Sequence, residues 1–269
     1  MRNLNQLKRA WLEVESRGLG RTERYCLDGF ERVVIGRGVV ATLRMPGALY
    51  GRMHAALSLV AGRWQVADLG SAGGTFINNV RIHTARWLDS GDVFWMNGGE
   101  RFQFVEEAID PRRAAHFQRL AESDDGDGAW LVLADTLQEL GDETGKKMVT
   151  AGEDFALPLG FLGPLRSDGA VTFSCRFGFI RTLTLRNLGL ARTLGLGVFP
   201  AVLRQPGVAL LRVLEVDLTS FDELPLPVLA AALRDDGPPS LRVLRLLGVF
   251  GAPPRHLFPP GLEVEWAPI

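Results

Sequence analysis

Seven short β-prone runs follow one another at regular spacing between Trp11 and Val105. They are WLEVES, ERVVIG, AALSLV, RWQVADL, TFINN, DVFWM and RFQFV, and turn-prone residues separate them. Short strands at regular spacing are typical of an all-β sandwich. We therefore expect residues 1–108 to form a sandwich, and the rest of the chain to fold separately.

The period of the apolar residues changes near residue 108. In IDPRRAAHFQRLAE, the pair Asp110-Pro111 is a stop-and-start signal, and a helical stripe begins with Ala115, Phe117 and Leu120. A second helix is expected after the polar DDGDG run, with Gly141 as its stop and with one apolar face formed by Trp130, Leu133, Ala134 and Leu137. We expect no calcium at DDGDG, because in the frame that starts at Ser123 the first ligand would be a serine and Ala134 occupies the position of the twelfth-residue glutamate ligand.

From residue 180 the chain repeats a strand-like pattern. IRTLTL begins at Ile180, LRVLEV at Leu211 and LRVLRL at Leu241, which are spacings of 31 and 30 residues. Periods of this size with L-x-x-L-x-L strands resemble leucine-rich repeats of the strand-plus-helix kind. The helical halves would be VFPAVLRQ and LPVLAAALRDD, and LEVEW would be a weaker fourth strand. An ordinary α/β domain with coincidental leucine strands is the alternative.

The charge balance argues against nucleic acid as a partner. The 269 residues include 30 Lys and Arg against 31 Asp and Glu, a formal net charge of −1, so no whole-chain basic field is present. Cys26 and Cys175 form no metal or redox spacing, which fits a reducing compartment. Because we find no signal-peptide core and no run of 18 apolar residues, we expect a cytoplasmic protein that does not enter a membrane.

A glycine-rich segment, DLGSAGGTFINN, extends from Asp68 to Asn79. It lacks the Gly-Lys-Ser/Thr ending of a Walker loop. The β-prone TFI follows the glycines, where a dinucleotide-binding motif needs a helix. A tight loop at the rim of the β domain remains.

Three further segments accompany this loop: IGRG at residues 35–38, GRMHAAL at 51–57 and WLDSGD at 87–92. In order and spacing the four segments resemble the forkhead-associated (FHA) domain. Its pattern is Gly-Arg, then Ser-Arg-x-His, then Asp-x-x-Ser-x-Asn-Gly-Thr-x-x-Asn, then Leu-x-x-Gly-Asp. The resemblance covers residues 1–108 and implies a β-sandwich whose loops at one end bind a phosphothreonine in a partner protein.

The chemistry of these segments suits an anion. A phosphate needs a fork of charged donors, which Arg37 between two glycines can supply, and backbone N–H groups that a glycine-rich loop brings close. The resemblance makes Arg37 the phosphate-binding arginine and Arg52 a neighbouring basic residue. It implies loop-bracing or loop-shaping positions at Gly36, His54, Gly74 and Thr75. Asn78 or Asn79 would hydrogen-bond the backbone of the bound peptide.

The departures from the FHA pattern bear on the phosphate itself. Gly51 stands where the family has its phosphate-binding serine, and Gly73 stands where it has the asparagine that holds the peptide. Ala72 offers no hydroxyl. A hydrogen bond to a charged group contributes roughly 1.5–3 kcal/mol, so loss of the serine alone would weaken binding by about 10- to 100-fold. Two interpretations stay open: phosphothreonine recognition, and a degenerate domain that binds an unphosphorylated surface.

The middle segment carries a second resemblance. WLVLADTLQELGDETG, from Trp130 to Gly145, is similar to a short helical module that precedes leucine-rich repeats in some bacterial proteins, and FGFIRTLTL is similar to their lead-in. Such a module would cap the repeats with Leu133, Leu137 and Leu140.

The expected protein is thus multidomain. It has an all-β FHA-type sandwich at residues 1–108, a helical capping module and connector at 109–170, and an α/β leucine-rich-repeat-like solenoid at 171–269. No catalytic signature is present, so we expect a non-catalytic bacterial signalling adaptor without a cofactor or metal. The sandwich would bind a phosphorylated protein. A second protein would bind the strand-lined face of the repeats, at Thr182, Thr184, Arg212, Glu215, Arg242 and Arg245.

Overall fold

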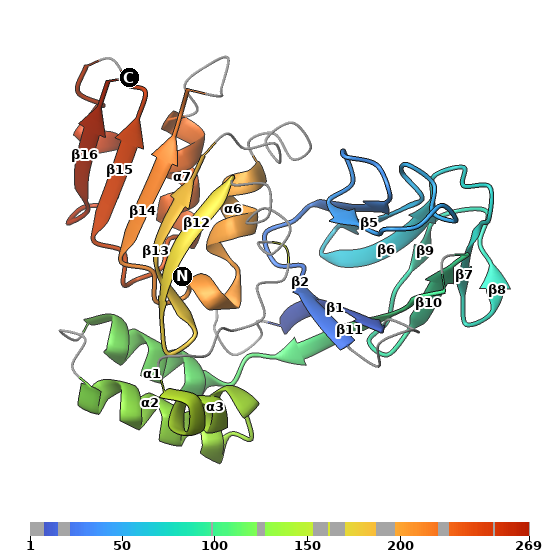
Figure 1. Cartoon of the computed structure of the whole chain (residues 1–269), viewed down its shortest axis with the longest axis horizontal. Helices are drawn as coiled ribbons and strands as arrows, with labels where there is room; N and C mark the ends of the chain where they lie inside the picture. Colours follow the sequence, from blue (N-terminus) through green and yellow to red (C-terminus); the bar gives the residue numbers. More distant parts are fainter. Residues whose placement is uncertain are drawn as a thin grey trace. The chain divides into compact units, whose positions relative to one another are not determined.

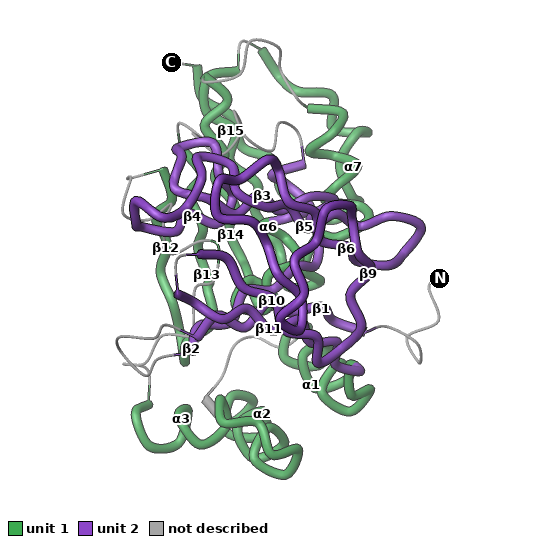
Figure 2. Tube along the Cα trace, turned by 90° about the vertical axis from the view of Figure 1, so that its right-hand side faces the viewer, with its two compact units in different colours: residues 1–7, 109–189, 202–269 green, residues 8–108, 190–201 purple. Residues whose placement is uncertain are grey.

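The structure is a computed structural model that describes residues 8–15, 22–97, 99–122, 127–152, 161, 170–186, 197–219, 226–249 and 251–268. The chain divides into two compact units, shown in Figure 2. One unit contains residues 8–108 and 190–201, and the other contains residues 1–7, 109–189 and 202–269. Residues 197–201 group with the first unit, whereas the sequence-based division places them in the repeat region at 171–269.

Two sheets build the first unit (Figure 1). The six-stranded sheet has the order β2-β1-β11-β10-β7-β8, formed by Thr22–Cys26, Lys8–Glu15, Arg101–Ala108, Val93–Met96, Thr75–Ile77 and Val80–Arg81. The five-stranded sheet has the order β4-β3-β5-β6-β9, formed by Leu43–Arg44, Arg32–Gly36, Ala55–Val60, Arg63–Asp68 and Arg86–Trp87. Neighbouring strands are antiparallel, except for the parallel pair β3 and β4. All seven expected strands are present, and the sequence patterns missed the short strands β2, β4, β8 and β9.

The core of this unit comes from alternating residues of both sheets. In β1, Leu12 and Val14 are buried between more exposed neighbours, as expected for a strand with one face in the core. Phe94 and Phe102 stack with ring centroids 5.1 Å apart. The five-stranded sheet adds Val33, Ile35, Leu57 and Val66, all fully buried. The expected β-sandwich is therefore confirmed.

Three helices begin the second unit: α1 at Pro111–Glu122, α2 at Asp127–Glu139 and α3 at Glu143–Ala151. The expected apolar face of α2 is buried, and Gly141 after it has a φ of 72°, as expected for a helix stop. Helix α3 was not predicted, although its N-cap residue Asp142 accepts a hydrogen bond from the Thr144 N–H. Residues 123–126, which include Ser123 and the first three residues of the DDGDG run, lie outside the described residues, so the expectation about calcium stays a prediction. Within the described ranges, no helix is long and apolar enough to cross a lipid bilayer.

A five-stranded sheet follows in the order β12 to β16 (Figure 1). The strands are Val171–Arg176, Phe179–Leu185, Val213–Asp217, Val243–Leu247 and Glu263–Ala267. β13 to β16 are parallel, with Leu183, Leu214, Leu244 and Val264 aligned in register. The helices α6 (Val198–Leu203) and α7 (Leu226–Asp236) lie where helical halves were expected, and short 3₁₀ turns span Pro206–Val208 and Arg255–Leu257. β12 pairs antiparallel with β13 and was not predicted.

The helical module packs against this sheet through an apolar cluster. Trp130, Leu133 and Leu137 are buried together with Phe179 and Leu210. The Trp130 ring lies 5.2 Å from the ring of Phe177, and Phe117 lies edge-on to Phe179. Leu140 remains partly exposed and does not belong to this cluster.

Three positions expected on the exposed strand face are placed differently. Thr184 is buried, and its neighbours in register are Thr172 of β12 and Glu215 of β14. Arg212 and Arg242 precede their strands, which begin two residues later than the repeated pattern, and the Arg242 guanidinium donates to the Ala121 carbonyl of α1 at 2.9 Å. Thr182, Glu215 and Arg245 are partly exposed positions on their strands.

Candidate functional site

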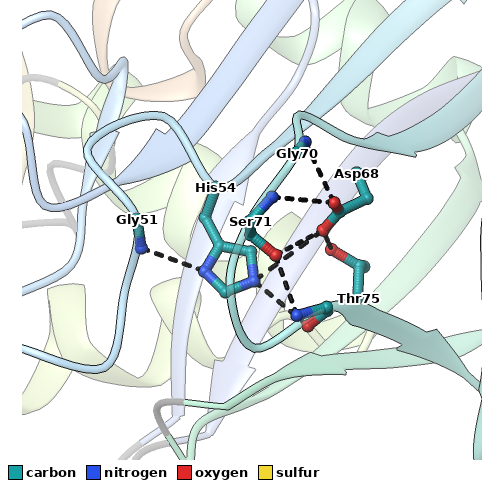
Figure 3. A network of polar contacts seen from close by, with 7 residues as sticks. Gly51, His54, Asp68, Gly70, Ser71 and Thr75 are labelled. Atoms are coloured by element: carbon teal, nitrogen blue, oxygen red, sulfur yellow. Dashed lines mark hydrogen bonds and ion pairs between the residues drawn. The ribbon is translucent and has the colours of Figure 1, made fainter.

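A buried histidine joins two loops of the sandwich (Figure 3). The Gly51 N–H donates to Nδ1 of His54 at 3.1 Å, and Nε2 of His54 lies 3.1 Å from the Gly74 carbonyl oxygen. Because Nδ1 accepts, the ring proton belongs on Nε2, from which it donates to Gly74. His54 thereby ties the loop between β4 and β5 to the loop between β6 and β7.

The loop between β6 and β7 folds around the carboxylate of Asp68 (Figure 3). The N–H groups of Gly70 and Ser71 donate to Oδ2 at 3.0 and 2.9 Å. The hydroxyls of Ser71 and Thr75 donate to Oδ1 at 2.6 and 2.7 Å, and the Gly74 N–H donates to Ser71 Oγ at 2.9 Å. Hydrogen bonds to the Asp68 carboxylate, at the start of the glycine-rich loop, and to the Ser71 hydroxyl within it therefore fix the path of this loop.

The same hydrogen bonds keep Asp68 ionised. Its partial burial opposes ionisation, but the bonds from Ser71 and Thr75 outweigh that effect, so the pKa of Asp68 lies below its usual range. An ionised Asp68 can only accept, which suits the four donors around it.

Arg37 lies directly after β3, and its side chain is exposed. Its Nε donates to the Tyr50 carbonyl at 2.8 Å, and its backbone N–H donates to the Gly51 carbonyl at 2.9 Å. The two terminal amino groups of the guanidinium carry the remaining donors. Within the described ranges, no carboxylate lies within ion-pair distance of Arg37 or of the exposed Arg52. Two positive charges that lack a carboxylate counter-ion among the described residues make this rim suitable for an anion.

Two glycines let the loops around Arg37 lie close together. A β-carbon at Gly36 would lie 2.4 Å from the Arg52 carbonyl oxygen, and one at Gly38 would lie 2.7 Å from the same atom. The Gly38 N–H donates to that oxygen at 2.9 Å. Gly36 is therefore required by the close approach of residue 52 and not by its backbone conformation.

The two glycines that depart from the FHA pattern differ in the space around them. A β-carbon at Gly51 would meet its nearest neighbour, the His54 Cα, at 3.4 Å, which is an ordinary contact. At Gly73 a β-carbon would lie 2.5 Å from the Cβ of Asn97, a side chain at the end of β10. The structure therefore has room for a side chain at residue 51, whereas at residue 73 the space is taken by Asn97.

The remaining candidate residues do not all lie at this rim, because Asn78 and Asn79 follow the end of β7 that is opposite to Gly73 and Gly74. Ala72 is exposed beside Gly73. Asn78 and Asn79 form the turn between β7 and β8, with φ values of 46° and 68°. The Asn78 side-chain amide donates to Asp92 Oδ1 at 3.2 Å, and the Asn79 side-chain oxygen Oδ1 accepts from Trp95 Nε1 at 3.2 Å. These contacts brace the turn, and both side chains stay exposed.

Sequence patterns missed three residues that bear on the rim. The guanidinium of Arg81 lies against Gly74, whose added β-carbon would be 2.5 Å from Arg81 Nε. Buried Tyr50, which holds Arg37 through its carbonyl, donates its hydroxyl to Glu100. Burial, and then the Glu100 carboxylate, raise the pKa of Tyr50 above its usual range, so the phenol keeps its proton. These contacts join segments distant in sequence, and no local pattern reports them.

The groups at this rim are suited to binding an anionic ligand. In the part of the chain that the structure describes, no three His, Cys, Asp or Glu side chains come together as metal ligands would. His54 is the one histidine of the network, and its two ring nitrogens already bond the backbone. Charged donors and backbone amides remain for a ligand.

Comparison with known proteins finds a family match for part of the chain. Residues 33–96 match the family model of the FHA domain. Similar solved structures include an FHA domain from an analysis of phosphothreonine-dependent FHA interactions, at 29% identity over 38% of this chain and 99% of that one, with a TM-score of 0.33. EmbR of Mycobacterium tuberculosis in complex with a low-affinity phosphopeptide is 24% identical over 38% of this chain and 25% of that one, with a TM-score of 0.33. The yeast Dun1 FHA domain in complex with a doubly phosphorylated peptide derived from Rad53 is 21% identical over 38% of this chain and 77% of that one, with a TM-score of 0.33. No curated protein matches the sequence.

Proposed function

We propose that the FHA domain at residues 33–96 binds a phosphothreonine-containing segment of a partner protein at the rim around Arg37. The observation that carries the proposal is the state of Arg37: its Nε is anchored on the Tyr50 carbonyl, while its exposed terminal amino groups have no carboxylate within ion-pair distance among the described residues. A dianionic phosphate would accept charge-assisted hydrogen bonds from these terminal amino groups and neutralise the charge of Arg37.

Neutral donors would supplement the arginines. The backbone N–H groups near Gly51 and Gly73 lie in the two loops that His54 and Asp68 hold in place. Preorganised amides cost little to order when a ligand binds, which partly offsets the missing serine and asparagine side chains. Phosphate-independent binding of a protein surface is the alternative, which the glycines at residues 51 and 73 keep open.

For the whole chain, we propose a non-catalytic signalling adaptor of a bacterial cytoplasm. Its second half would be a short leucine-rich-repeat-like array, a proposal supported by the 31- and 30-residue offsets between register-aligned strands. The helical module would cap this array, and the apolar cluster around Trp130 and Phe179 supports that role. A second protein would bind the array, where Glu215 and Arg245 are adjacent in register on β14 and β15.

A titration of the full chain tests the phosphate site. Calorimetry would compare a phosphothreonine peptide library with its unphosphorylated counterpart. Binding should require the phosphate, and Arg37→Ala should weaken it by about 10- to 100-fold, the cost of a charge-assisted hydrogen bond. Arg32→Ala is the matched control, because Arg32 is also exposed and lies at the other end of β3. Equal binding of both libraries, unaffected by Arg37→Ala, would instead establish phosphate-independent recognition.

A further inference from the structure

Two loops beside Arg37 expose large apolar side chains. Val39 is 81% exposed, Val40 46%, Leu49 62% and Met53 51%. We call these four residues the apolar collar. Apolar side chains gathered on the surface of a soluble domain mark interaction sites more often than chance.

Backbone hydrogen bonds bring the collar residues together. The Gly38 N–H donates to the Arg52 carbonyl at 2.9 Å, so Val39, which follows Gly38, runs beside Met53, which follows Arg52. Leu49 precedes Tyr50, whose carbonyl accepts from Arg37 Nε at 2.8 Å. The collar is therefore continuous with the rim that carries the two arginines.

We propose that the apolar collar selects phosphothreonine segments that carry large aliphatic side chains next to the phosphothreonine. This inference rests on the proposed function of the rim. The side chains of the collar offer aliphatic and thioether groups and no hydrogen-bond donor. A polar or acidic flank would lose hydration against them without a compensating bond, whereas an aliphatic flank gains by leaving water.

The two arginines would recognise the phosphate, and the apolar collar would recognise the residues that flank the phosphothreonine. The phosphate neutralises the charge of Arg37 and Arg52, which an uncharged apolar ligand would leave buried and unpaired. The collar then distinguishes one phosphopeptide from another, because every phosphothreonine offers the same charge to the arginines. The occupant that fits both is an apolar-flanked phosphopeptide.

Two sets of synthetic phosphothreonine peptides test this selectivity on the full chain. They share one core and carry either leucine or serine at the flanking positions, and unphosphorylated copies of both sets are included. We expect the leucine set to bind at least about 10-fold more tightly, since burial of one aliphatic side chain is worth about that factor. Val39→Ser combined with Met53→Ser should reduce the preference to about 3-fold or less while binding still requires the phosphate.

The control is the pair Leu59→Ser and Val60→Ser. These residues are 41% and 43% exposed at the end of β5 farthest from His54, and their replacement should keep the preference intact. Should the double collar variant unfold, Leu49→Ser alone gives the same test at a single position. If the leucine and serine phosphopeptides bind equally tightly, the proposed role of the collar is wrong, while the proposed function of the rim is unaffected. Absence of phosphate-dependent binding to either set would overturn both.

Discussion

Replacing His54 by alanine removes the side chain that joins the two loops of the rim. The Gly74 carbonyl lies in a buried residue and would lose its partner at a cost of about 1–3 kcal/mol. The Gly51 N–H is half-buried, so water replaces its bond in part, and that loss is about 1 kcal/mol. We therefore expect His54→Ala to lower the free energy of unfolding by about 2–4 kcal/mol, and the lost packing of the imidazole adds to this.

Two further substitutions separate the two bonds. In His54→Asn the amide oxygen can take the place of Nδ1 and accept from Gly51, while the bond to Gly74 is lost. In His54→Gln the terminal amide can take the place of Nε2 and donate to Gly74. Because the Gly74 carbonyl is the more buried group, His54→Gln should retain more stability than His54→Asn.

Urea denaturation of the full chain measures these differences, provided that the transition of the sandwich is followed separately. The backbone amide signals of Val33 and Ile35, which are fully buried in β3, report on it in NMR spectra recorded along the urea series. A loss below about 0.5 kcal/mol in His54→Ala would refute the reasoning, because it would mean that the loops hold their positions without the imidazole.

The remaining predictions concern the glycines and Asp68. Gly36→Ala should destabilise the sandwich by about 1–3 kcal/mol in urea denaturation, because its β-carbon would meet the Arg52 carbonyl at 2.4 Å, whereas Gly51→Ala should be tolerated. Gly51→Ser should fold normally and bind a phosphothreonine peptide more tightly in calorimetry, since it adds a hydroxyl to the rim, and weaker binding would favour the phosphate-independent alternative. Gly73→Asn should be destabilising, and Asn97→Gly in the same chain should relieve it; an additive double variant would contradict the steric account. The pKa of Asp68 is lowered in the folded state, so its contribution to stability is present above its unfolded pKa of about 3.9 and is lost as the pH falls through the folded pKa. The difference in stability between the wild type and Asp68→Asn should therefore shrink on acidification below about pH 4, and a constant difference would contradict that assignment.

Much of the sandwich could be predicted because its signals are local. Alternation of apolar residues placed the long strands, and the turn-prone pair Asn78-Asn79 at the end of the TFINN run forms a turn with positive φ at both residues. The two-residue strands β4, β8 and β9 were missed, because a strand of that length has no periodicity of its own.

In the second unit the sequence signals were mixed. The helix α2 and the aligned strands β13 to β15 follow from period and spacing. Helix α3 was missed although Asp142 is a clear N-cap residue, because its apolar stripe is short. Arg212 and Arg242 were misplaced, since a repeated LRVL pattern does not reveal at which of its residues a strand begins.

At the rim, the sequence indicated which segments meet but not what fills the space between them. From the sequence, Gly73 indicates only that the asparagine side chain of the FHA pattern is absent. In the structure, the side chain of Asn97 occupies the space next to Gly73. Arg81 against Gly74 and Tyr50 beneath Arg37 depend on tertiary contacts that single-sequence patterns do not encode.

The most direct test of the phosphate site is a ¹H–¹⁵N correlation spectrum of the full chain during titration with a phosphothreonine peptide. The side-chain Nε–H of Arg37 and the backbone amides of Gly51, Gly73 and Gly74 are the groups to follow, with Gly62 in the turn after β5 as the internal control. We expect these four signals to shift with the phosphorylated peptide, to stay in place with its unphosphorylated copy, and the Gly62 signal to remain unchanged in both. Shifts of the same size with both peptides, or no shift at Arg37 when the phosphopeptide binds, would contradict phosphothreonine recognition at this rim.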